Sequence, residues 1–79
     1  MKSIRLSRHA RRRMDLYGIT LEQITRTLAE PEYLVPSVKG RYNAYRKMGG
    51  RFLRVTYAED DSHCVVVSVT PRKRFEGVI

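Results

Sequence analysis

The 79-residue sequence has no tryptophan, a single cysteine, three prolines and only eight acidic residues. The lone cysteine, Cys64, cannot form an internal disulfide, so nothing indicates an oxidising compartment. No apolar run is long enough to span a bilayer, and we find no repeat, linker or low-complexity segment. We therefore expect one soluble domain over residues 1–79, located in the cytoplasm and making no membrane contact.

Residues that bind metals or nucleotides are equally scarce. The two histidines, His9 and His63, and Cys64 are isolated from one another, and no pair of them has the spacing of a zinc site. The glycine pair at residues 49–50 lacks the flanking pattern of a phosphate-binding loop. We expect neither a metal nor a cofactor.

Basic residues, in contrast, are abundant. Sixteen lysines and arginines give a net charge of +8 and a pI of about 10.3. Such a surplus favours polyanionic partners, namely RNA, DNA, an acidic protein or an anionic membrane surface. Charge alone does not choose among these partners.

The first 30 residues have the pattern of two helices. Ser7 is a suitable N-cap and Gly18 a suitable helix end, with apolar residues at helical spacing between them. Thr20 and Gln23 fit a capping box that starts a second helix, and Pro31 ends it. Because so few residues separate the two helices, we expect them to form a tight corner.

Strand patterns follow, over residues 33–38, 41–48, 51–58 and 63–70, the last closed by Pro71. Pro36 marks the first strand as an edge, and the glycine pair at 49–50 predicts a hairpin. The expected fold is α+β, with two N-terminal helices packed on one face of a three- to four-stranded antiparallel sheet. Alternation predicts the core residues Leu53, Val55, Tyr57, Val65, Val67 and Val69, packed against Ala10, Met14, Ile24 and Leu28.

The first helix carries the clearest chemical pattern. His9, Arg12 and Arg13 lie on adjoining positions, and a spacing of four makes His9 and Arg13 neighbours. Metal-free RNA cleavage needs an acid or base and cations around the phosphate. His9 can supply the acid or base, and Arg13 can supply a cation beside the phosphate. The structural alternative is a histidine that bonds local backbone, surrounded by solvated arginines.

Two strands carry further candidates. Residues 41–47 interleave tyrosines, which stack on unpaired bases, with basic residues, which contact phosphates. An ordinary amphipathic strand explains this pattern equally well. Arg54, Ser68 and Thr70 can form a guanidinium and hydroxyl site on the open sheet face, although threonine is also common in strands for its β propensity. The candidate RNA-binding residues are Arg12, Arg41, Tyr42, Tyr45, Arg46, Ser68 and Thr70.

Several segments in succession resemble a known family. They are SRHARRRM at residues 7–14, YGITLEQI at 17–24, EP at 30–31, GRY at 40–42, LRV at 53–55 and VVSV at 66–69. Their order and spacing resemble the family called domain of unknown function 4258. That family is similar in fold to RelE-like toxins and to small ribonucleases of the barnase, EndoU and colicin types.

The resemblance implies a metal-independent endoribonuclease, of the kind that forms the toxin of a toxin–antitoxin pair. By position, His9 and Arg13 match the family's helix motif, Arg41 and Tyr42 match a strand motif, and Arg54 matches the next. We expect His9, Arg13 and Arg54 to be the catalytic residues. Ser68 stands where the family pattern usually has threonine, and Thr70 where it often has tyrosine.

Two other functions fit the same scaffold. One is a basic module that binds RNA or DNA without cutting it. The other is an interaction domain whose basic face binds an acidic protein, such as an antitoxin tail. The expected partners are thus RNA and an acidic antitoxin, and the expected state is a monomer or a small homo-oligomer.

Overall fold

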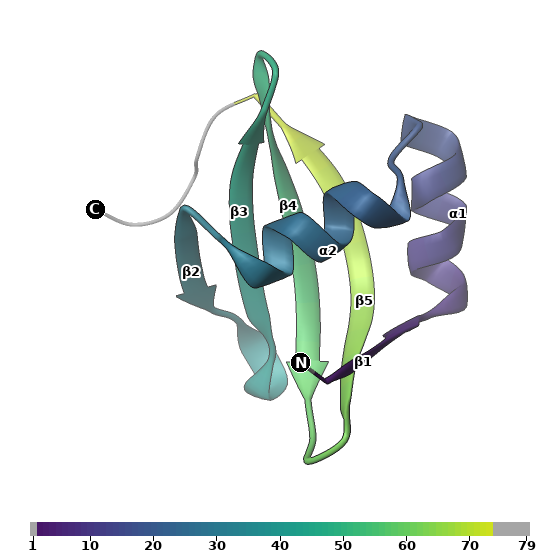
Figure 1. Cartoon of the computed structure of the whole chain (residues 1–79), viewed down its shortest axis with the longest axis vertical. Coiled ribbons are helices and arrows are strands. Elements are labelled where there is room, and N and C mark those ends of the chain that lie inside the picture. The colour runs from purple at the N-terminus through teal and green to yellow at the C-terminus, as the bar shows by residue number, and fades with distance from the viewer. Residues whose placement is uncertain (1, 74–79) are drawn as a thin grey trace.

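Two helices lie on one face of a five-stranded sheet in the computed structural model, which describes residues 2–73 (Figure 1). Helix α2 crosses the middle of the sheet, and α1 packs against β5. The elements are β1 (Ser3–Leu6), α1 (Arg8–Tyr17), α2 (Leu21–Ala29), β2 (Tyr33–Pro36), a 3-10 turn (Val38–Gly40), β3 (Tyr42–Met48), β4 (Arg51–Glu59) and β5 (His63–Arg72).

Helix α1 begins where the sequence predicts. The Ser7 hydroxyl accepts a hydrogen bond from the Ala10 N–H (3.0 Å) and donates one to the Val67 carbonyl (2.8 Å). The cap thus also ties the start of the helix to β5. Gly18 ends α1 in the left-handed conformation, with φ of 66°, which glycine adopts without the steric cost of a Cβ.

Helix α2 has the predicted capping box. The Thr20 hydroxyl accepts from the Gln23 N–H, and the Gln23 side chain accepts from the Thr20 N–H. At the other end, the helix stops at Ala29, two residues before Pro31. The Arg46 guanidinium of β3 donates to the Glu30 carbonyl (2.7 Å), so a strand side chain satisfies the C-cap of α2.

The sheet has five strands in the order β1-β5-β4-β3-β2, and it is mixed. The predicted antiparallel strands are present as β2 to β5, but the prediction missed β1 and with it the parallel pair. Strand β1 pairs in parallel with residues 63–66 of β5. Strand β1 was not predicted because only two alternating apolar residues, Ile4 and Leu6, mark it. A parallel pair formed across sixty residues also has no turn motif between its strands.

The remaining pairs are antiparallel, as expected. Strand β2 is an edge, which confirms the prediction from Pro36, and Gly49-Gly50 forms the β3–β4 turn. Pro71, however, does not end β5, which continues to Arg72. Strand β1 covers only residues 63–66, so the end of β5 has a sheet neighbour on one side alone and tolerates a proline.

The core lies between the helices and the sheet. Leu53 and Val55 of β4 meet Ala10 and Ile24 of the helices there, as predicted, with Met14 and Leu28 packed at its margin. The predicted core face of β5 was wrong in part: the buried residues are Cys64, Val66 and Val69. A bulge shifts the register of β5 against β4 between Thr56 and Tyr57, so strict alternation fails there.

Candidate nucleic-acid interface

A row of three side chains, His9, Arg13 and Tyr17, runs along the solvent side of α1. The Arg13 Nε donates to His9 Nε2 at 3.4 Å, a long and weak hydrogen bond, and Arg13 Nη1 donates to the Tyr17 hydroxyl at 2.9 Å. The Arg13 guanidinium also lies 5.8 Å from the centre of the Tyr17 ring. The expected contact between His9 and Arg13 is confirmed. Tyr17 was missed, although its spacing of four from Arg13 would have revealed it.

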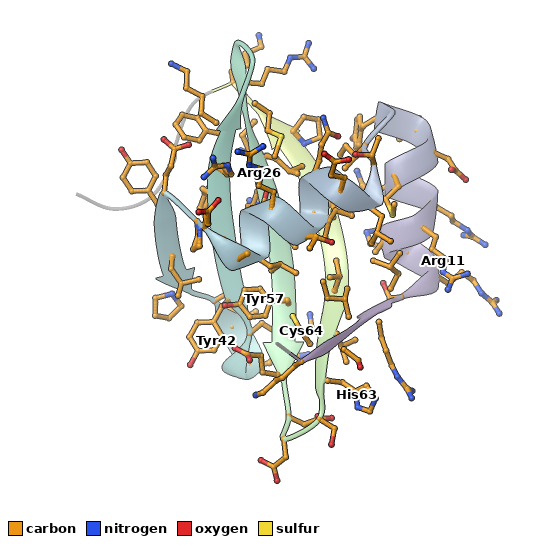
Figure 2. All side chains as sticks on the ribbon, viewed as in Figure 1. Arg11, Arg26, Tyr42, Tyr57, His63 and Cys64 are labelled. Atoms are coloured by element: carbon orange, nitrogen blue, oxygen red, sulfur yellow. The ribbon has the colours of Figure 1, made fainter. Side chains whose placement is uncertain are left out.

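The positive charge of α1 is concentrated in its first half. Arg8, Arg11 and Arg12 are exposed, and the first turn has no acidic residue. Figure 2 shows Arg11 projecting from α1 away from the sheet. Positive side chains near a helix N-terminus add to the positive end of the helix dipole, an arrangement that a bound anion relieves. This end of α1 therefore favours a phosphate-bearing partner.

A second polar surface lies on the sheet face opposite the helices. The register pairs Arg54 with Thr70 and Thr56 with Ser68, so the predicted face is confirmed. The Thr56 hydroxyl donates to the Asn43 side chain (2.7 Å). The Arg54 Nε is buried and makes no hydrogen bond to the residues that the structure describes. A buried N–H without a partner is costly, so the Arg54 guanidinium favours an acceptor at this position.

The candidates on β3 have different positions. Tyr45 pairs with Arg54 on the sheet face opposite the helices, but it is only 4% exposed, so its ring presents no surface on which a base can stack. Tyr42 is 39% exposed and lies 5.8 Å from the Tyr57 ring. Arg46 caps α2, and Arg41 is half-buried just before β3. Of these four residues, Tyr42 is the one that offers a ring to solvent.

The structure does not bring all the predicted site residues together. His9 and Arg13 lie on α1, whereas Arg54 and Thr70 face away from the helices. No hydrogen bond or ion pair among residues 2–73 joins His9 to Arg54. The candidate interface therefore consists of two surfaces, the α1 row and the open sheet face, and not of one cleft.

Acid–base groups elsewhere have structural roles. The Asp60 side chain accepts from the Ser62 and His63 N–H groups, and these bonds lower the pKa of Asp60. Burial, together with the nearby Glu59 carboxylate, raises the pKa of the Cys64 thiol, which favours its protonated form. Within residues 2–73, no cluster of three side chains is able to hold a metal ion. In the same range, every helix is too short or too polar to cross a membrane.

Fold and surface together define a small, basic α+β domain with an arginine-rich first helix. The chain belongs to the family described as domain of unknown function (DUF4258), whose profile matches residues 6–71. Curated proteins and solved structures give no match. Membership of the family is thereby confirmed, while the expected likeness to RelE-like toxins stays a prediction.

Proposed function

We propose that this protein binds RNA and cleaves it through the ribose 2′-hydroxyl, without a metal ion, using the row on α1. The observation that carries the proposal is the contact of His9 with Arg13 on an exposed, arginine-rich helix. An imidazole supplies acid–base chemistry near neutral pH, and a guanidinium beside it suits the phosphate on which that chemistry acts.

The geometry supports specific roles. His9 Nε2 accepts from Arg13, so this nitrogen carries the lone pair that a general base needs. The long hydrogen bond is easily exchanged for one to a 2′-hydroxyl. His9 then takes the hydroxyl proton, the 2′-oxygen attacks phosphorus, and the 5′-oxygen leaves with a proton from solvent. Arg13, held by Tyr17, stabilises the charge that develops on the phosphate.

The second surface contributes binding in this proposal. Arg54, with Ser68 and Thr70 near it, contacts a phosphate of another nucleotide, and Arg12 and Arg41 add charge at the margins. The buried Arg54 Nε, which has no hydrogen-bond partner within residues 2–73, supports this assignment. Tyr42, which lies beside Tyr57 on the helix side of the sheet and not on the second surface, is the ring that remains available for stacking on a base.

The test is a cleavage assay on mixed single-stranded RNA in excess chelator. We expect products with cyclic or 3′-phosphate ends. His9→Ala should lower the rate about a hundredfold or more, since one general base typically contributes that much. His63→Ala is the matched control, because His63 is the first residue of β5 and contacts Asp60 instead of the row on α1, so the rate should stay unchanged.

Other results would overturn cleavage and identify the alternatives. Intact RNA that is retarded on a gel, with retardation fading as salt rises, would identify a non-catalytic binding module. Intact RNA without retardation would contradict RNA binding and leave an acidic protein as the partner of the basic helix.

A further inference from the structure

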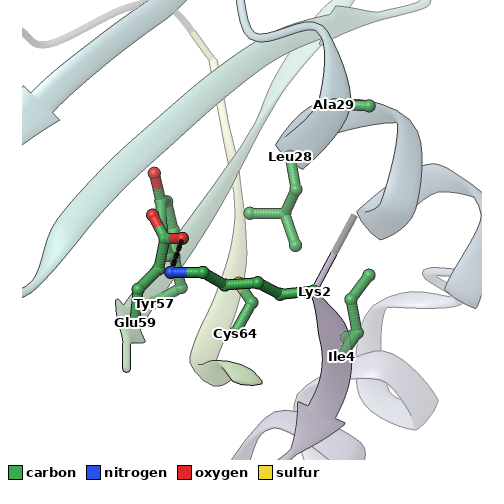
Figure 3. Close-up of a pocket in the computed structure, with 7 residues that line it drawn as sticks. All are labelled: Lys2, Ile4, Leu28, Ala29, Tyr57, Glu59 and Cys64. Carbon is green, nitrogen blue, oxygen red and sulfur yellow. Dashed lines mark ion pairs between the residues drawn. The ribbon is translucent and has the colours of Figure 1, made fainter. Parts of the chain in front are cut away.

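A pocket of about 150 Å³ lies between α2, β1 and the ends of β4 and β5, on the helix side of the sheet (Figure 3). Its lining is mostly apolar and includes Ile4, Leu28 and Cys64. Tyr57 forms part of the wall, and burial raises the pKa of its hydroxyl, which therefore remains a neutral hydrogen-bond donor. A space of this volume holds one six-membered aromatic ring, so a purine base would insert that ring and leave its five-membered ring at the mouth.

An ion pair spans the pocket. The Lys2 ammonium lies 3.1 Å from the Glu59 carboxylate, and Figure 3 shows Lys2 extending from β1 across to Glu59. Both side chains are about two-fifths exposed. An ion pair this exposed contributes little to stability, so its two charges are available to a ligand at small cost. The pocket thus joins an apolar lining to one strong acceptor and one strong donor.

We infer that this pocket binds a guanine base, with Glu59 and Lys2 contacting its Watson–Crick edge. Guanine presents two adjacent donors, N1–H and the N2 amino group, which match the two oxygens of a carboxylate. The neighbouring O6 is an acceptor and matches an ammonium group. Adenine, cytosine and uracil lack two adjacent donors on this edge, so the same pair of side chains contacts them less well.

The surrounding charge favours a base over a phosphate at this place. Asp60 and Asp61 follow Glu59 directly, and their carboxylates repel a phosphodiester. The ligand therefore enters by its ring, with the phosphates directed away from the turn. The choice of RNA as the source of the guanine rests on the proposed function, whereas the chemistry of the pocket does not.

Titration of the ¹⁵N-labelled protein with guanosine, adenosine, cytidine and uridine, followed by NMR, tests the inference. We expect guanosine to bind about tenfold or more tightly than the others and to shift the amides of Ile4, Leu28, Tyr57 and Cys64. Glu59→Gln should weaken guanosine binding about tenfold to a hundredfold, as expected when a charged acceptor is lost. The matched control is Asp61→Asn, which removes a nearby charge outside the pocket lining.

A second variant blocks the space itself. Ala29→Phe places a ring at the exposed rim of the pocket and should abolish guanosine binding in a folded protein. Equal binding of all four nucleosides, no binding at all, or full binding by Glu59→Gln would each overturn the inference. His9-dependent cleavage without guanosine binding would refute the pocket assignment alone, and guanosine binding without cleavage would refute the nuclease alone.

Discussion

Replacing Ser7 by alanine tests how α1 is held against the sheet. The hydroxyl makes two hydrogen bonds, one to the Ala10 N–H and one to the Val67 carbonyl. Loss of an N-cap costs about 1 kcal/mol. Loss of a half-buried hydrogen bond to a strand carbonyl costs about 1 kcal/mol more. Ser7→Ala should therefore lower the free energy of unfolding by about 2 kcal/mol, or the Tm by about 8–16 °C for a domain of this size.

Urea unfolding followed by circular dichroism measures this change, with two comparisons that separate the bonds. Thr20→Ala removes an exposed cap without a bond to the sheet and should cost about 1 kcal/mol. Ser7→Thr keeps a hydroxyl and should stay close to the original stability. If Ser7→Ala costs no more than Thr20→Ala, the bond to Val67 contributes nothing and the argument for a double role is refuted.

Two further predictions concern the other end of α2 and the acidic turn. Arg46→Met should lower the free energy of unfolding by about 1 kcal/mol, because the Glu30 carbonyl loses its donor, and should leave RNA retardation unchanged. Weaker retardation in a fully stable variant would contradict this structural role. The Ser62 and His63 N–H groups lower the pKa of Asp60 in the folded protein below its ordinary value of 3.8. The ionised Asp60 therefore stabilises the fold above pH 3.8, and this contribution is lost as the pH falls through the lowered pKa. Asp60→Asn should therefore destabilise the protein at neutral pH and match it in strong acid, as measured by urea unfolding, and an equal deficit at both pH values would contradict the assignment.

Local chemistry made the helices predictable. Each residue that starts or ends a helix bonds to a partner no more than four positions away, so its role is visible in the sequence. These residues are Ser7, Gly18, Thr20 and Gln23. The contact between His9 and Arg13 is equally local, because helical geometry alone makes residues four apart neighbours.

Predictions failed where distant segments decide the structure. Strand β1 is stable only as a partner of β5, and the bulge in β5 depends on its pairing with β4. The sequence also did not reveal that Tyr45 is buried on the sheet face opposite the helices. The pocket of Lys2 and Glu59 escaped notice for the same reason, since the two residues are far apart in the chain.

The sequence by itself determined the two capped helices, the four antiparallel strands, the surplus of positive charge and the row on α1, because each depends on composition or on neighbours along the chain. Tertiary structure alone decided that β1 joins the sheet, that His9 and Arg54 lie on separate surfaces, and that Lys2 meets Glu59 across a pocket. These features depend on which surfaces pack together. Packing is decided by the burial of the whole core, which no short segment of the sequence determines alone.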